Sequence, residues 1–102
     1  MKVLISPGYG AGWSTWGDPG MATDKRLIEL FEQGCTEEEM ADFCVECGYT
    51  DGYGHAPYMG GFSDLVVTEI PNGSLFKIRE YDGNEYIEIF DESDWLRAED
   101  NS

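Results

Sequence analysis

Basic residues are scarce in this chain of 102 residues. It contains six Lys and Arg against 21 Asp and Glu, with a single histidine, which gives a formal net charge of −15. Binding to nucleic acid or to an anionic membrane needs clustered Lys and Arg to neutralise phosphates, so we expect neither. The sequence also lacks an apolar run near the roughly 20 residues that a membrane-spanning helix needs. Its composition therefore predicts a soluble acidic protein.

Cysteine is also scarce. The chain has three cysteines, an odd number, and only a short apolar stretch precedes its first proline. We therefore expect no disulfide framework and no secretory signal, and we predict a reducing, cytoplasmic setting. A Cys3His zinc site is conceivable from Cys35, Cys44, Cys47 and His55. However, Cys44 and Cys47 fall in an apolar helical stripe, which favours core packing over zinc binding or a redox pair. We predict no metal and no cofactor.

The length of the chain predicts a single domain over residues 1–102, because so short a chain can bury only one modest core. Hydrophobic residues make up 41% of the chain and aromatic residues 14%. These fractions are too high for a disordered protein, even at this net charge. We expect a last turn, capped by Ser93, that carries Trp95 and Leu96, and then a frayed acidic tail over residues 97–102.

Two helices are predicted in the first half of the chain. The first is expected over residues 24–33, with Thr23 as its N-cap and a glycine just past its end. The second is expected over residues 37–47, because Thr36 and Glu39 have the spacing of a capping box. The short link between the two helices predicts a helical hairpin or an angled pair.

Strands are expected at the start of the chain and after Asp64. Residues 2–6 have the apolar run of a short strand, and apolar and polar residues alternate from Asp64 onward. The Asn72-Gly73 and Asp82-Gly83 pairs are hairpin signals, so we predict a three-stranded antiparallel meander. Its inner face would set Val67 opposite Ile78 and Ile78 opposite Ile87, and its outer face Leu75 opposite Phe90, Lys77 opposite Glu88, and Arg79 opposite Tyr86. The predicted fold is α+β, with the meander and the N-terminal strand packed against the two helices.

Two long loops combine glycine with aromatic residues: loop 1 over residues 7–20 and loop 2 over residues 49–62. Both adjoin predicted strand ends, where binding loops are usually mounted on a rigid scaffold. We expect the loops to face the same side and to form a binding surface. The expected contact residues are Tyr9, Trp13, Trp16, Tyr53, His55 and Tyr58. Alternatively, these aromatic side chains fold back and extend the core.

Catalytic patterns are weak. His55 has Asp51 near it in sequence, but the hydroxyls of Ser6, Ser14 and Thr15 lie in no nucleophile motif. We therefore predict that the protein is not an enzyme.

Negative charge is the clearest feature of the chain. Two acidic stretches, residues 29–51 and 80–100, contain Arg97 as their only basic residue. A net charge of about 2 to 8 is enough to keep a small domain soluble, and a larger one costs stability through self-repulsion, which indicates a function. The predicted partner-binding residues are Glu37, Glu38, Glu39, Asp42, Glu46, Glu85, Glu88, Asp91 and Glu92.

Three segments carry a resemblance to a known group of proteins: MKVLISPGYGAGWSTW at residues 1–16, YMGGF at residues 58–62 and LFKIREYDG at residues 75–83. In these segments the chain resembles a family of small acidic proteins encoded by phages and prophages. The family has no known catalytic residue to transfer. Small acidic phage proteins often act as stoichiometric inhibitors, so the resemblance implies a binding role in the cytoplasm of a host cell.

Charge and resemblance together predict a non-enzymatic, anti-CRISPR-like inhibitor of a host defence or nucleic-acid-processing complex. Its acidic face would compete for a basic groove of a host protein or nucleoprotein complex. The alternative is a small-molecule sponge that sequesters a nucleotide immune signal in a pocket between the two loops. An exposed edge strand or aromatic loop could also support a homodimer.

Overall fold

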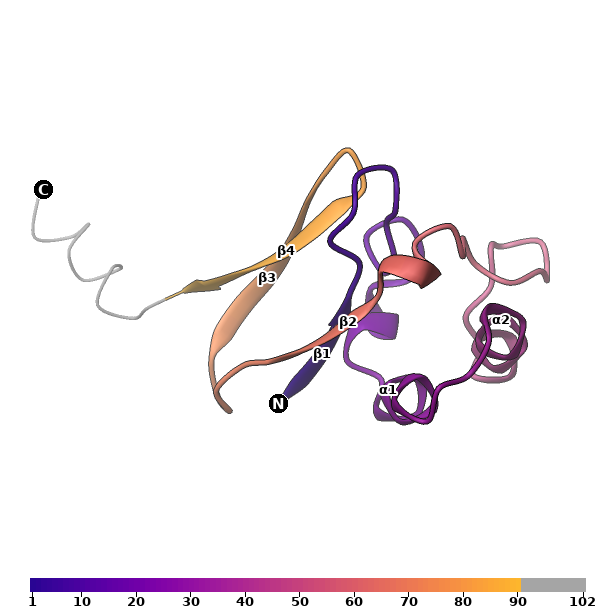
Figure 1. The fold of residues 1–102 in the computed structure, drawn as a ribbon, viewed down its shortest axis with the longest axis horizontal. Helices are drawn as coiled ribbons and strands as arrows, with labels where there is room; N and C mark the ends of the chain where they lie inside the picture. Colours follow the sequence, from indigo (N-terminus) through magenta and orange to yellow (C-terminus); the bar gives the residue numbers. More distant parts are fainter. Residues whose placement is uncertain (91–102) are drawn as a thin grey trace, which may run out of the picture.

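The computed structural model describes residues 1–90 and shows an α+β fold, as predicted (Figure 1). Its strands are β1 (Lys2–Ile5), β2 (Val66–Glu69), β3 (Leu75–Tyr81) and β4 (Asn84–Phe90), and its helices are α1 (Lys25–Glu32) and α2 (Glu37–Glu46). Two 3-10 turns, η1 (Pro19–Ala22) and η2 (Phe62–Asp64), lie in or beside the loops. None of the helices in this part of the chain is long and apolar enough to cross a membrane. The expected turn at Ser93 and the expected tail lie outside the described residues.

Strand pairing differs from the prediction at one point. β2 pairs with β1 rather than with β3, so residues 1–90 contain two antiparallel pairs, β1–β2 and β3–β4. Leu4 lies opposite Val67, and the expected pair of Val67 with Ile78 does not form. Pro71 gives the physical reason, because it has no N–H for a ladder bond and ends β2 just before the Asn72-Gly73 turn. β1 then covers the free edge of β2.

The β3–β4 hairpin forms as predicted. Leu75 pairs with Phe90, Lys77 with Glu88, and Arg79 with Tyr86. Asp82 and Gly83 at the turn have φ angles of 54° and 85°, and this left-handed backbone is what a two-residue hairpin turn of this type requires. Local sequence therefore determined both the turn and the register of this pair.

Both helices also form close to the predicted bounds. Thr36 and Glu39 make the expected capping box at the start of α2. The N-cap of α1, however, is Asp24 and not Thr23, because the Asp24 carboxylate accepts a hydrogen bond of 2.9 Å from the backbone N–H of Arg26. Asp24 also accepts a hydrogen bond from the hydroxyl of Tyr49 and forms an ion pair with Arg26.

The core lies on both faces of β1, whose Val3, Leu4 and Ile5 are all buried. Leu4 joins a cluster under the helices, made of Leu4, Trp13, Met21, Leu27, Ile28, Met40, Cys44 and Leu65. Val3 and Ile5 join a second cluster with Ala22 and Ile70, and the inner face of the β3–β4 hairpin packs against it. Figure 1 accordingly shows the hairpin and α2 at opposite ends of the described molecule, with β1, β2 and α1 between them.

The Asp24 cap predicts a pH-dependent stability. Hydrogen bonds from the Arg26 side chain are the main cause that holds the pKa of Asp24 well below its usual value. The contribution of Asp24 to stability is therefore complete above the unfolded-state pKa of about 3.9 and is lost as pH falls below it. Asp24→Ala is expected to lower the free energy of unfolding by about 1–2 kcal/mol at pH 7. In urea denaturation, the gap from wild type should shrink between about pH 4 and pH 2.

The matched control for this prediction is Thr23→Ala, which alters the neighbouring exposed side chain and should leave the urea midpoint close to that of the wild type. A gap between Asp24→Ala and wild type that stays constant down to pH 2 would contradict the assignment of this carboxylate as an ionised cap.

Candidate functional site

Loops 1 and 2 lie against each other on one side of the molecule. The rings of Trp16 and Tyr58 are 5.2 Å apart between centroids and are tilted by 58°. The Tyr58 hydroxyl donates a hydrogen bond of 2.9 Å to the carbonyl oxygen of Gly10. The Ser6 hydroxyl, at the end of β1, donates one of 3.0 Å to the carbonyl oxygen of Gly61. The two loops therefore form one surface.

Glycine lets two aromatic rings of this surface lie directly on the backbone. A Cβ at Gly12 would stand 2.5 Å from the ring of Trp16. A Cβ at Gly60 would overlap the ring and hydroxyl of Tyr58. Gly12 also has a φ of 75°, which a residue with a side chain rarely adopts. Part of the glycine content of the loops therefore serves to seat these rings.

A small pocket opens between the loops, and we call it the loop pocket. It has a volume of about 270 Å³ and is lined by Trp16, Gly17, Thr50, Asp51, Pro57 and Tyr58. Asp51 accepts hydrogen bonds from the backbone N–H groups of Tyr53 (2.8 Å) and His55 (3.2 Å), which fold the segment after it into a tight turn. These hydrogen bonds, that of Tyr53 above all, lower the pKa of Asp51 and keep it ionised at neutral pH. The pocket thus presents two aromatic rings and one carboxylate.

The structure places the predicted ligand-contacting residues in three different environments. Trp16 and Tyr58 line the loop pocket and are 43% and 42% exposed. Tyr9, Tyr53 and His55 are highly exposed and are not among the residues that line it. Trp13 is wrong as a surface contact, because it is fully buried in the core cluster that lies under the helices. That aromatic side chain extends the core, which was the alternative expectation.

The acidic residues predicted on α2 are all on the surface: Glu37, Glu38, Glu39, Asp42 and Glu46. Glu39 has a second role, because its carboxylate accepts a hydrogen bond of 2.8 Å from the backbone N–H of Thr36. This contact lowers the pKa of Glu39. We call these five exposed acidic residues the α2 patch. Glu39 belongs both to this patch and to the helix cap.

Glu85 is not part of an acidic face. It is fully buried, and its carboxylate accepts hydrogen bonds from four groups. One oxygen accepts from the backbone N–H of Ser6 (2.9 Å), and the other accepts from the backbone N–H groups of Trp13 and Thr15 (2.9 Å each) and from the Thr15 hydroxyl (2.6 Å). The prediction that Glu85 contacts a partner is therefore wrong, since this side chain holds loop 1 onto β4. The sequence contained the signal, because Glu85 alternates in phase with Ile87, which packs against the core.

The remaining acids of the predicted face do not extend the α2 patch. Glu88 is paired with Arg79 at 2.8 Å on the outer face of the hairpin. Because β4 and α2 lie at opposite ends of the described molecule (Figure 1), Glu88 belongs to a separate surface. Asp91 and Glu92 lie outside the described residues. The patch on α2 is the part of the predicted face that the structure brings together.

The cysteines pack in the core, as the helical stripe predicts. Cys44 is fully buried, and Cys35 and Cys47 pack against the same cluster. Burial raises the pKa of Cys44 to about 12, which keeps this thiol protonated at neutral pH. Within residues 1–90, no group of three His, Cys, Asp or Glu side chains is placed to hold a metal ion. The exposed His55 lies with its Nδ1 3.6 Å from a carboxylate oxygen of Asp51.

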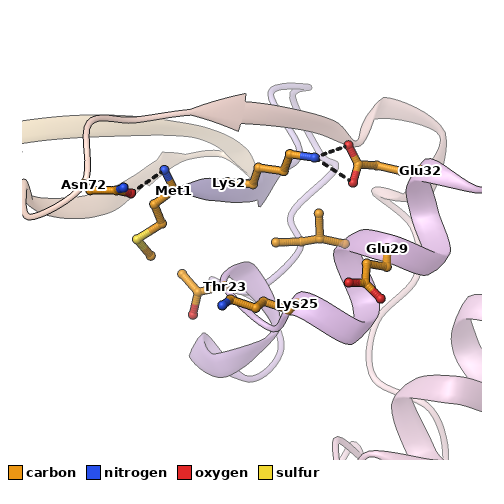
Figure 2. Close-up of a pocket in the computed structure, with 8 residues that line it drawn as sticks. Met1, Lys2, Thr23, Lys25, Glu29, Glu32 and Asn72 are labelled. Carbon is orange, nitrogen blue, oxygen red and sulfur yellow. Dashed lines mark hydrogen bonds and ion pairs between the residues drawn. The ribbon is translucent and has the colours of Figure 1, made fainter.

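A larger hollow lies between the start of β1, the length of α1 from Lys25 to Glu32 and the turn after β2 (Figure 2). It has a volume of about 460 Å³. Lys2 and Lys25 line it together with Glu29 and Glu32, and the ammonium group of Lys2 lies 2.8 Å and 3.0 Å from the two carboxylate oxygens of Glu32. Met1 also lines the hollow, and its N-terminal ammonium group lies 4.0 Å from a carboxylate oxygen of Glu69. Cationic groups and carboxylates are therefore mixed around this hollow, and neither sign of charge dominates.

Comparison with known proteins gives no further guide to the site. No family model, no curated protein and no solved structure matches this chain.

Proposed function

We propose that this protein is a non-enzymatic inhibitor that binds a basic, nucleic-acid-binding groove of a host protein or nucleoprotein complex through the α2 patch. One observation carries the proposal. Residues 27–76 contain ten acidic residues and no Lys or Arg, and all ten side chains are exposed. Half of them lie on α2: Glu37, Glu38, Glu39, Asp42 and Glu46. The other half are spread over other parts of the fold: Glu29, Glu32, Asp51, Asp64 and Glu69.

So many exposed negative charges lower the stability of the folded protein. Self-repulsion of so many exposed carboxylates destabilises the compact state, while a far smaller net charge keeps a small domain soluble. A concentrated negative charge favours binding to a positive surface, because it accelerates encounter with that surface and repels partners of like charge. A groove that normally holds nucleic acid offers the complementary charge. The charge of the α2 patch therefore supports competition with nucleic acid for such a groove.

The resemblance of the chain to small acidic phage proteins gives the proposal its biological form, inhibition of a CRISPR effector in the host cytoplasm. A nucleotide sponge remains the second candidate, because a hollow of about 270 Å³ lies between the two loops. The lining of that pocket argues against it, since Asp51 contributes negative charge and the residues that line it include no lysine or arginine to meet a phosphate.

Inhibition of target-DNA cleavage by purified CRISPR effector complexes tests the proposal. The test variant combines Glu37→Gln, Glu38→Gln, Asp42→Lys and Glu46→Lys, and it leaves Glu39 and Glu85 in place because one caps α2 and the other is buried. The wild type is expected to inhibit at concentrations close to that of the effector. The variant should need at least about tenfold more protein, because several exposed charge contacts are lost together.

The matched control carries the same change in net charge away from α2: Glu29→Lys, Asp64→Lys and Glu69→Lys. It should inhibit within about twofold of the wild type, and the inhibition by the wild type should weaken as salt rises. Equal inhibition by the wild type and the α2 variant, or no inhibition of any effector tested, would contradict the proposal.

A further inference from the structure

We infer that the loop pocket binds the guanidinium group of an arginine side chain that the basic partner presents. The inference rests on the proposed function, because a basic groove supplies such side chains, and it adds a second contact beside the α2 patch. It also gives the aromatic loops a role that charge alone does not explain.

The chemistry of the lining selects a cation. The rings of Trp16 and Tyr58 have negatively polarised faces, and each is more than two-fifths exposed. Asp51 uses one carboxylate oxygen for the backbone turn, and its other oxygen lies 3.6 Å from the Nδ1 atom of His55, beyond hydrogen-bond distance. That second oxygen can therefore accept a hydrogen bond from a ligand. Glu80 adds a further carboxylate close by, since it accepts a hydrogen bond of 3.3 Å from the indole N–H of Trp16.

Shape and size favour arginine over other ligands. A guanidinium is planar, so it can stack on an aromatic ring while its edge donates hydrogen bonds to a carboxylate, which the compact ammonium of lysine does less well. The volume of about 270 Å³ lies below the 300–1,000 Å³ typical of pockets for whole small molecules. A single side chain therefore fits the loop pocket better than a nucleotide.

The site is held in shape before any ligand arrives. Gly12 and Gly60 let the two rings lie on the backbone, and the hydrogen bond from Tyr58 to Gly10 ties loop 2 to loop 1. A preformed site loses little conformational freedom on binding, so even one side chain can be recognised measurably.

Nuclear magnetic resonance titration of the full chain with N-acetyl-arginine amide tests the inference. The readout is the indole N–H resonance of Trp16, assigned by comparison with Trp16→Leu. We expect a saturable shift with a Kd on the order of millimolar. N-acetyl-citrulline amide, which has nearly the same shape without the charge, should bind at least about fivefold more weakly, and adenosine 5′-monophosphate should not shift the resonance.

Asp51→Asn is the sharpest variant, because asparagine keeps the acceptor for the turn and removes only the charge. It should weaken binding of N-acetyl-arginine amide by about two- to fivefold. Asp42→Asn, the same change on α2, and Tyr9→Ala, an exposed aromatic of loop 1 outside the pocket, should leave the Kd within error. In the cleavage assay, Asp51→Asn and Trp16→Leu should both inhibit less well than the wild type.

Three results would overturn the inference: no shift of the Trp16 indole with N-acetyl-arginine amide, equal binding of the citrulline probe, or a saturable shift with the nucleotide. Its failure is distinguishable from failure of the proposed function. The α2 variant should bind N-acetyl-arginine amide as tightly as the wild type does. If that variant binds arginine and also still inhibits cleavage like the wild type, only the α2 proposal is contradicted. Loss of inhibition without arginine binding would contradict the loop pocket alone.

Discussion

Replacing Glu85 by alanine is expected to unfold the protein or to leave it barely stable at room temperature. The change removes the acceptor of two buried backbone N–H groups, those of Ser6 and Trp13, and each such group costs about 1–3 kcal/mol. The partly buried N–H and hydroxyl of Thr15 lose the same acceptor and add a smaller cost. Small domains are stable by only about 5–15 kcal/mol in total. Glu85→Gln should be less severe, with a loss of roughly 2–4 kcal/mol, because one amide oxygen still accepts while the amide nitrogen faces other donors.

Urea denaturation followed by circular dichroism measures both effects on the Glu85 variants. Glu88→Gln is the control from the same strand. Its carboxylate is half-exposed and paired on the outer face, so its urea midpoint should stay near that of the wild type. Wild-type stability of Glu85→Gln would show that this carboxylate does not hold loop 1 in place.

The two tryptophans of loop 1 are expected to behave in opposite ways. Trp13→Ala removes a fully buried side chain from the core and should lower the free energy of unfolding by about 3–5 kcal/mol. Trp16→Ala removes a side chain that is 43% exposed and packs against Tyr58 at a tilt of 58°, and it should cost no more than about 1.5 kcal/mol. In the titration with N-acetyl-arginine amide the order should be reversed, so that Trp16→Ala weakens binding more than Trp13→Ala does.

Trp13→Phe refines this test. The indole N–H of Trp13 is buried and makes no hydrogen bond within the described residues. Phenylalanine removes that unsatisfied donor and part of the ring, so it should cost clearly less than alanine. Thermal unfolding of the three variants, with the wild type, checks the order. Equal loss for Trp13→Ala and Trp16→Ala would contradict the placement of Trp13 in the core.

Features fixed by neighbouring residues could be predicted from the sequence. The capping box of Thr36 and Glu39, and the Asp82-Gly83 turn with its register, depend on contacts within a few residues. The helix bounds came from apolar spacing together with caps. The one local error, Thr23 instead of Asp24 as an N-cap, arose because both residue types cap helices well and stand side by side.

Features fixed by distant contacts were missed. Pro71 indicates that residues 66–69 end before the Asn72-Gly73 turn, but nothing nearby indicates that residues 2–5 are their partner. Glu85 was assigned to the surface because it is charged, although its phase in β4 points inward. A buried carboxylate becomes favourable only when distant donors converge on it, and those donors come from loop 1. For the same reason composition alone could not separate Trp13 from Trp16.

The position of Glu85 also bears on how the chain folds during synthesis. Its hydrogen bonds join residues 79 and 72 positions apart in sequence, and the pairs of β1 with β2 join residues 61 to 67 positions apart. Contacts of such long separation close large loops, which slows folding. Almost all of the described chain must therefore be synthesised before loop 1 can adopt its folded conformation. Until then the glycines and aromatic rings of loop 1 lack the contacts that they make in the folded protein. The molecule should acquire its binding surface in one late, concerted step rather than progressively from its N-terminus.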